Sequence, residues 1–275
     1  TDFKFNIVGS NIDDFPELPH ISDFDKVEIS STVFKNMILW AIAIISHDRN
    51  EKRNHILGTS LTCIEEEGHI FFRMISTDGR RLTKTDHVLE TPPNFLEPGK
   101  GVLIPKKALS EVVKFLDKEE NIHIGVKDNY FIVKKEKENI YINLLSGDFP
   151  DLSTLFAENE NRYVIQLNRR EIKDMIERMS ILTSEDYKGV IFKFENDTLY
   201  INAANPDKGE SYEYMKIEFK GKKIEALFNP FYFIDALSLI REDDVYLKIK
   251  EEESPCIICG VKSPQEINII MPMRI

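Results

Sequence analysis

The chain has 275 residues, of which 42% are hydrophobic and 30% are charged, a balance that is typical of globular proteins and excludes wholesale disorder. Its formal net charge of −11 disfavours a simple nucleic-acid coat, and its three cysteines are too few for a disulfide framework, which favours a reducing, cytoplasmic location. The longest apolar run, residues 37–45, is too short to span a bilayer, and the first residues do not resemble a signal peptide.

In the first half of the chain the sequence predicts a strand, a buried helix, a hairpin and a second helix. Alternation of apolar and polar side chains over residues 3–7 indicates the strand, and the apolar run over residues 37–45 indicates the buried helix. Asp78 and Gly79, flanked by strand-forming residues, are typical of a tight hairpin turn. The second helix is expected over residues 106–116, with Pro105 in its first turn.

The second half of the chain predicts similar elements. A helix is expected over residues 168–182, because apolar side chains recur there at helical spacing and Asn168 is a good N-cap with Glu171 three residues later. Residues 198–201 and 245–249 are rich in β-branched and aromatic side chains and predict strands. Helices set among many antiparallel strands indicate an α+β fold.

The chain contains an internal repeat. The motif DFPEL at residues 14–18 returns as DFPDL at residues 148–152, and FKNMI at residues 34–38 returns as IKDMI at residues 172–176. Because the matching blocks keep one order, the sequence predicts two tandem units. We expect one domain over residues 26–157 and another over residues 158–275. Residues 1–25 would then be the last strand and linker of a preceding unit, with Thr1 as a cut end.

No set of residues has the spacing of a catalytic or metal site. Cys256 and Cys259 have C-x-x-C spacing, but they lie in a predicted strand with no second cysteine pair or nearby histidine, so core packing is favoured. A glycine-rich phosphate loop and a G-x-S-x-G elbow are absent from the sequence. Asp148 and Asp151 fit turn chemistry, although a hydrolase built on such carboxylates is a rival hypothesis. We therefore expect no catalysis, cofactor or metal.

Taken together, the blocks resemble one family, the β subunit of bacterial DNA polymerase III, or sliding clamp. The resemblance rests on the segments DFPELP, STDGRRL, IPKKALSEVVKFL, SGDFPDL, EDYKGVIF, AANPDKGE, FNPFYFIDAL and MPMRI, which span almost the whole chain in the family's order. It implies a tandem repeat of clamp domains, each with two inner helices and outer antiparallel sheets, and the chain would carry the second and third of three. It also implies a non-catalytic processivity factor whose head-to-tail dimer forms a ring around duplex DNA.

The resemblance further implies a hydrophobic cleft between the second and third domains, lined in part by the terminal residues. This cleft would bind Gln-Leu-x-Leu-Phe-like peptides from polymerases, the clamp loader and repair proteins, and methionine and aromatic side chains suit such an adaptable pocket. The residues implied for the cleft are Ile56, Thr77, Gly79, Arg80, Leu82, Pro150, Leu155, Tyr187, Asn229, Tyr232, Ile269, Met271, Pro272, Met273 and Arg274. Thr154 and Cys256 depart from the residues that related clamps commonly carry.

A ring would reconcile the acidic charge with DNA binding, because basic side chains would be confined to the inner helices and to a loop at the rim. They would contact phosphates and carry no sequence information. The residues implied for DNA binding are Lys35, Arg49, Lys52, Arg53, Lys107, Lys114, Arg169, Arg170, Lys173 and Arg178. The alternative hypothesis is an isolated peptide-binding module that does not encircle DNA.

Overall fold

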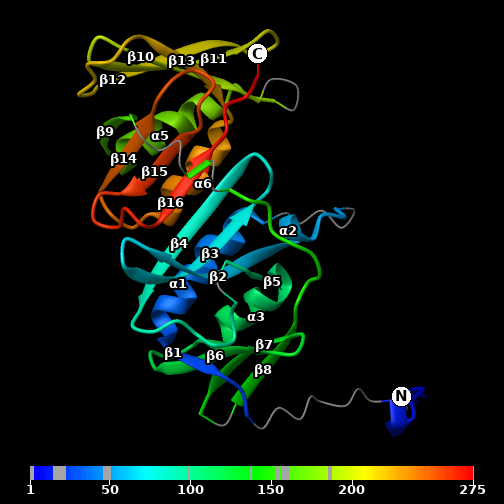
Figure 1. The fold of residues 1–275 in the computed structure, drawn as a ribbon. Coiled ribbons are helices and arrows are strands. Elements are labelled where there is room, and N and C mark those ends of the chain that lie inside the picture. The colour runs from blue at the N-terminus through cyan, green and yellow to red at the C-terminus, as the bar shows by residue number, and fades with distance from the viewer. Residues whose placement is uncertain are drawn as a thin grey trace.

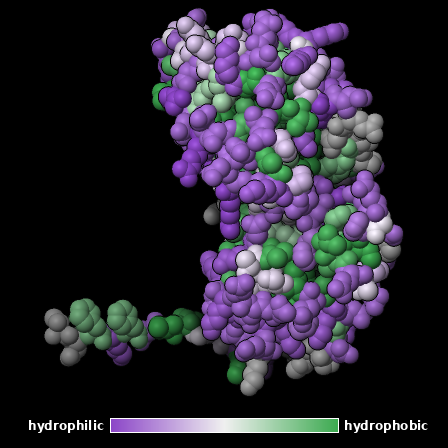
Figure 2. Space-filling view, turned by 90° about the vertical axis from the view of Figure 1, so that its left-hand side faces the viewer, coloured by the Kyte–Doolittle hydropathy of each residue, from purple (hydrophilic) through white to green (hydrophobic). Residues whose placement is uncertain are grey.

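The computed structural model describes residues 3–14, 23–45, 51–97, 99–136, 138–152, 155–156, 161–184 and 188–274. Two halves are stacked along the long axis of the molecule, and residues 3–14 lie apart from both of them (Figure 1). Figure 2 shows the two lobes with a hollow between them along one edge of the outline. No helix in the described part of the chain is long and apolar enough to cross a membrane.

The first half contains a short 3-10 helix, three α-helices and eight strands among the described residues. Their order is η1 (Ile12–Asp14), β1 (Lys26–Ser30), α1 (Ser31–Ile44), α2 (Asn54–Leu57), β2 (Gly58–Glu66), β3 (His69–Thr77), β4 (Arg81–Leu89), β5 (Val102–Pro105), α3 (Lys106–Phe115), β6 (Asn121–Lys127), β7 (Tyr130–Lys135) and β8 (Glu138–Asn143).

The second half has a similar order of elements. It contains β9 (Tyr163–Asn168), α5 (Arg169–Ser180), β10 (Val190–Glu195), β11 (Thr198–Asn205), β12 (Gly209–Lys216), β13 (Ile224–Phe228), α6 (Pro230–Leu239), β14 (Asp244–Ile249), β15 (Cys256–Gly260) and β16 (Ile267–Ile270). The α+β class predicted from the sequence is confirmed.

Three antiparallel sheets hold these strands. One four-stranded sheet has the order β1-β6-β7-β8 and the other has the order β12-β11-β10-β13. Between them, an eight-stranded sheet with the order β5-β2-β3-β4-β16-β15-β14-β9 combines strands of both halves (Figure 1). The junction is the antiparallel pair β4 and β16, in which Leu82 lies opposite Ile269. The two halves therefore share main-chain hydrogen bonds as well as side-chain contacts.

Three hydrophobic cores correspond to the two halves and the seam between them. The first core packs α1 and α3 against the strands of the first half, and the second packs α5 and α6 against those of the second half. A smaller third core lies at the seam, where Leu82 of β4 meets Ile269 of β16, and Leu152 and Leu155 pack against it. Trp40 of α1 is 2% exposed and belongs to the core of the second half, so one helix of the first half reaches across the seam.

The predicted helices form close to their expected bounds. The side chain of Asn168 caps α5 by accepting hydrogen bonds from the amides of Arg170, at 3.1 Å, and Glu171, at 3.2 Å. The helix predicted over residues 106–116 is α3, but Pro105 occupies its N-cap position rather than its first turn. The buried helix expected at residues 37–45 is the second part of α1, whose first residue is Ser31.

The strand predicted over residues 3–7 does not form. Residues 3–11 carry no regular secondary structure, and Phe3 and Phe5 are 81% and 82% exposed. A strand needs a neighbour for its backbone hydrogen bonds, and none of the described strands lies beside this segment. The assignment of residues 1–25 to a preceding unit, and of residues 26–157 and 158–275 to two domains, remains our prediction.

Candidate functional site

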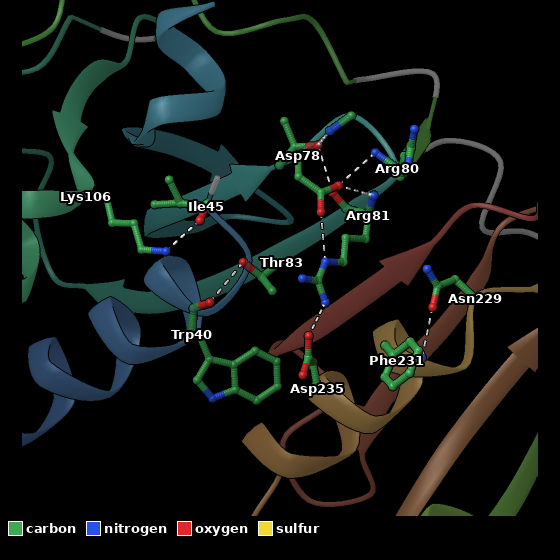
Figure 3. Close-up of polar contacts among 12 residues, drawn as sticks. Trp40, Ile45, Asp78, Arg80, Arg81, Thr83, Lys106, Asn229, Phe231 and Asp235 are labelled. Atoms are coloured by element: carbon green, nitrogen blue, oxygen red, sulfur yellow. Dashed lines mark hydrogen bonds and ion pairs between the residues drawn. The ribbon is translucent and has the colours of Figure 1, made fainter. Parts of the chain in front are cut away.

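The β3–β4 hairpin forms a rigid loop at the seam. Gly79 has φ +86°, a conformation that glycine adopts without strain. The carboxylate of Asp78 accepts hydrogen bonds from the amides of Arg80, at 2.9 Å, and Arg81, at 3.0 Å. The Thr77 hydroxyl donates to the carbonyl of Arg81 at 2.8 Å and accepts from the amide of Gly79 at 3.0 Å. The sequence STDGRR therefore fixes its own backbone and presents its arginines from a set position (Figure 3).

Arg81 ties this hairpin to helix α6 of the second half. Its Nε lies 2.9 Å from Asp78 Oδ2, and its Nη1 lies 2.6 Å from Asp235 Oδ2 on α6 (Figure 3). The guanidinium carbon is 4.4 Å from the centroid of the Tyr232 ring, a cation–π distance. Because the Arg81 side chain is only 14% exposed, these contacts are partly shielded from water and hold α6 beside the hairpin.

The C-terminal residues continue beyond β16 as an ordered apolar segment. The amide of Met271 donates to the carbonyl of Arg80 at 2.9 Å, and the amide of Met273 donates to the carbonyl of Leu227 at 2.7 Å. Pro272 lies between these two residues and has no amide hydrogen to satisfy. The segment is thereby attached to the hairpin and to β13, while Met271 remains 40% exposed.

A first cavity of about 250 Å³, the proximal cavity, opens beside the hairpin. Most of its lining matches the cleft residues implied by the resemblance, namely Ile56, Thr77, Gly79, Leu82, Pro150, Leu155, Ile269 and Met271. Four lining residues were not assigned to the cleft from the sequence: Arg53, His55, Arg81 and Leu152. The wall combines the hairpin, α2, the segment around Pro150 and the end of β16, so both halves contribute.

A second cavity of about 520 Å³, the distal cavity, shares Gly79 and Met271 with the first. The rest of its lining is Arg80, Lys188, Asn229, Tyr232, Pro272, Met273 and Arg274, of which only Lys188 was not implied by the resemblance. The side-chain oxygen of Asn229 accepts the amide of Phe231 at 3.0 Å and caps α6, which explains its fixed place in the wall (Figure 3). The implied cleft residues that the structure describes thus line two adjoining cavities.

Two of the four proximal residues that sequence reasoning missed, Arg53 and His55, lie close to Ile56 in the chain. His55 packs edge-on against Phe149, with ring centroids 6.3 Å apart. Arg53 forms a two-point ion pair with Glu51, at 2.7 and 2.9 Å, and this arginine lowers the pKa of Glu51 to about 2. For these two residues the signal in the sequence was their closeness to Ile56, which is too weak to assign them to a pocket.

Some residues that the sequence singled out pack in the hydrophobic cores, and others lie outside the described residues. Cys256 packs in the core of the second half and Cys259 packs in the seam core, and burial raises the pKa of both thiols. The core-packing interpretation of these cysteines is confirmed. No group of metal-ligating side chains occurs in the described ranges. Outside the described residues lie Arg49, Thr154 and Tyr187.

Most of the predicted DNA-binding side chains have intramolecular partners. Lys35 donates to the carbonyl of Leu116 at 2.8 Å, and Arg169 donates to that of Glu242 at 2.6 Å, so both satisfy backbone groups. Arg178 forms a two-point pair with Glu213 at 2.7 Å, which raises the pKa of the guanidinium. The remaining pairs are Arg53 with Glu51, Lys114 with Glu111 and Lys173 with Glu177.

Three of the predicted DNA-binding residues keep an unpaired charge. Lys52, Lys107 and Arg170 are exposed and form no ion pair with any described residue. Lys107 lies at the start of α3 in the first half, and Arg170 lies at the start of α5 in the second half. Among the described residues, these three have the charge most accessible to phosphates, and the assignment of the whole set to DNA binding stays a prediction.

Comparison with known proteins agrees with the arrangement of two clamp-like halves. The model of the DNA polymerase III beta subunit central domain matches residues 28–151, and that of its C-terminal domain matches residues 154–274. The beta sliding clamp of Staphylococcus aureus is 30% identical over 276 residues, covering 98% of this chain and 70% of that protein. That of Chlamydia muridarum is 27% identical over 271 residues, covering 98% and 71%.

Solved structures show the same likeness. A DNA polymerase III beta subunit from Eubacterium rectale has a TM-score of 0.83 and 26% identity, covering 98% of this chain and 71% of that one. The Bartonella birtlesii sliding clamp bound to griselimycin has a TM-score of 0.86 and 21% identity, covering 96% and 70%, and at that identity it supports the fold alone. The fold and the matches define a replication protein of the clamp class. The chain belongs to the DNA polymerase III β subunit family, the bacterial sliding clamps.

Proposed function

We propose that the chain forms part of a non-catalytic ring around duplex DNA and docks replication and repair proteins through the cleft at its seam. The observation that carries this proposal is the pair of adjoining cavities, whose walls come from both halves. A groove of this kind suits an extended peptide with apolar anchors. The expected partners are the replicative polymerase, the clamp loader, and other polymerases and repair proteins that carry Gln-Leu-x-Leu-Phe-like peptides.

The proposed function requires only binding and no catalytic step. The two thiols of the C-x-x-C pair are buried with raised pKa, so they are poor nucleophiles at neutral pH. All three cysteines are free and buried, which suits a reducing cytoplasm. Enclosure of DNA would give processivity without sequence recognition, because the candidate contacts are cations suited to phosphates.

The proposed DNA contacts are tested by charge reversal. Replacing Lys107 and Arg170 together with Glu should weaken binding to duplex DNA and reduce the slope of log affinity against log salt by about 2, since each phosphate contact contributes roughly 0.9. Fluorescence anisotropy with a labelled duplex over a salt series measures this slope. The matched control replaces Lys220 and Lys222 with Glu, which makes the same charge change in an exposed loop after β12.

Equal slopes for the two double variants would remove the DNA-binding role from α3 and α5. In that case peptide binding without encirclement, the alternative hypothesis, would be favoured. Preserved peptide binding in the Lys107 and Arg170 variant separates the two roles, because neither residue lines the cleft.

We also propose that the ring closes head-to-tail through β12. This strand lies at the edge of its sheet, and Tyr212 and Tyr214 on it are 72% and 61% exposed. In the first half the corresponding strand is β4, the fourth strand of that half, and it pairs with β16 of the second half. A head-to-tail contact joins two different surfaces. We propose that β12 of the C-terminal domain supplies one surface and that the family's first domain supplies the other. The matched central and C-terminal domains would then carry only the β12 surface.

The 275-residue chain on its own is therefore expected to be a monomer in dilute solution, while still binding partner peptides. Static light scattering checks its mass over a range of concentrations. A stable closed dimer of this polypeptide would contradict the assignment of the closing surface.

A further inference from the structure

We propose that the distal cavity selects partner peptides that carry an acidic residue beside their apolar anchors. This inference rests on the proposed peptide-docking function and adds a chemical preference to it. Among the described residues, the distal cavity is lined by three cations, Arg80, Lys188 and Arg274, and by no carboxylate. That composition is unexpected in a chain whose formal net charge is −11.

The three cations are available to a ligand. Each is exposed, and none has an ion pair or side-chain hydrogen bond with a described residue. The two arginines of the neighbouring proximal cavity differ in this respect, because Arg53 is paired with Glu51 and Arg81 with Asp78 and Asp235. In the described part of the chain, the arginines of the proximal cavity are therefore neutralised by ion pairs, whereas the cations of the distal cavity have no such partner.

The backbone holds two of these cations in place. The amide of Arg80 donates to Asp78 and its carbonyl accepts the amide of Met271, so the residue is fixed on both sides. Arg274 follows Met273, whose amide is bound to the carbonyl of Leu227. Asp78, a carboxylate next to Arg80 in the chain, is occupied by the side chain of Arg81 and by loop amides. Preorganised backbone with free charged side chains favours binding of an external anion.

The shape of the site favours a peptide over other anions. The distal cavity, of about 520 Å³, adjoins the apolar proximal cavity of about 250 Å³, so a single extended chain can place apolar side chains in one and a carboxylate in the other. Tyr232 and Met273 add apolar wall to the distal cavity, which suits the carbon atoms of a Glu or Asp side chain. A DNA duplex cannot enter cavities of this size.

The test compares three labelled peptides that share the core Gln-Leu-Ser-Leu-Phe. One has neutral flanks, one has two Glu residues before the core, and one has two Glu residues after it. One of the acidic peptides should bind about three- to tenfold more tightly than the neutral peptide at low salt, as expected for a few exposed ion pairs. The advantage should shrink strongly at roughly 0.5 M salt, where the Debye length falls to a few ångströms.

Substitutions assign the preference to the distal cavity. The ratio of the acidic to the neutral affinity should fall in Lys188→Ala and in Arg80→Ala, and approach one in the double variant. Lys222→Ala is the matched control, since Lys222 is an exposed lysine that lines neither cavity, and it should keep the wild-type ratio. Fluorescence anisotropy measures all of these affinities.

The outcomes separate this inference from the function on which it rests. If all three peptides bind equally at low salt, the preference is wrong while the docking function stands. If none binds, both are wrong. If the acidic peptides show no advantage and duplex DNA displaces the neutral peptide in a manner that depends on Lys188, the cations serve nucleic acid and the inference is overturned.

Discussion

Deletion of residues 271–275 should reduce the affinity for a Gln-Leu-x-Leu-Phe-like peptide by about thirtyfold or more. Met271 contributes to both cavities, and Pro272, Met273 and Arg274 line the distal one. Loss of a buried interface anchor typically costs ~2 kcal/mol or more, which corresponds to that change in dissociation constant. Anisotropy titration of a labelled peptide into the deleted and wild-type proteins gives the ratio directly.

The deletion also removes two backbone hydrogen bonds, those from Met271 to Arg80 and from Met273 to Leu227. Met273→Ala is therefore a useful companion, because it keeps the backbone and removes only side-chain wall. Phe5→Ala serves as the control, since Phe5 is 82% exposed and far from the cleft in the sequence. Urea unfolding establishes that each variant is folded, and an unchanged affinity in the folded deletion variant would disprove the location of the cleft.

Replacement of Trp40 with Ala should lower the free energy of unfolding by about 3–5 kcal/mol. Trp40 is the single tryptophan of the chain and is 2% exposed. It is carried by α1 of the first half but packs in the core formed around α5 and α6, and Figure 3 shows its ring directed toward α6. Its loss would leave a cavity at the seam, so the two halves should no longer unfold as one unit.

Urea denaturation followed by circular dichroism measures the change in stability. The Trp40→Phe substitution is expected to lower the free energy of unfolding much less than Trp40→Ala, because it keeps an aromatic ring in the same space. Phe231→Ala on α6 is the matched control, since Phe231 is an aromatic residue that is 50% exposed. A Trp40→Ala protein with the wild-type midpoint and a single sharp transition would show that this residue does not couple the halves.

Local patterns in the sequence were sufficient to predict α1, α3, α5 and the β3–β4 hairpin. The apolar spacing of α5 and the capping side chain of Asn168 are both encoded within a few residues, and so is the turn at Gly79. The strand expected over residues 3–7 was wrong because alternation specifies a strand only when a neighbouring strand is present. Backbone hydrogen bonds in sheets join residues that are far apart in the sequence. The sequence of one strand therefore does not show which strand pairs with it.

The same limit applies to the site. Motif resemblance assigned Arg80 and Met271 to the cleft, and both line cavities at the seam. It did not assign Arg81, whose partner Asp235 is far away in the sequence. Arg178 was assigned to DNA because it lies on a basic helix, yet the fold brings Glu213 of β12 against it. Whether a basic side chain has an acidic partner depends on which strands and helices are neighbours in the fold. A local sequence pattern does not give this information.

The eight-stranded sheet that crosses the seam has a mechanical consequence. The strands β4 and β16 are joined by residue pairs that run from Arg81 with Ile270 to Lys84 with Ile267. Because of this pairing, the halves cannot move independently as two domains on a flexible linker would. Bending at this point would require breaking main-chain hydrogen bonds and exposing the third core. We therefore expect the two halves to keep a fixed relative orientation. In the ring that we propose, the width of the channel would then be set by the chain before DNA or a partner arrives.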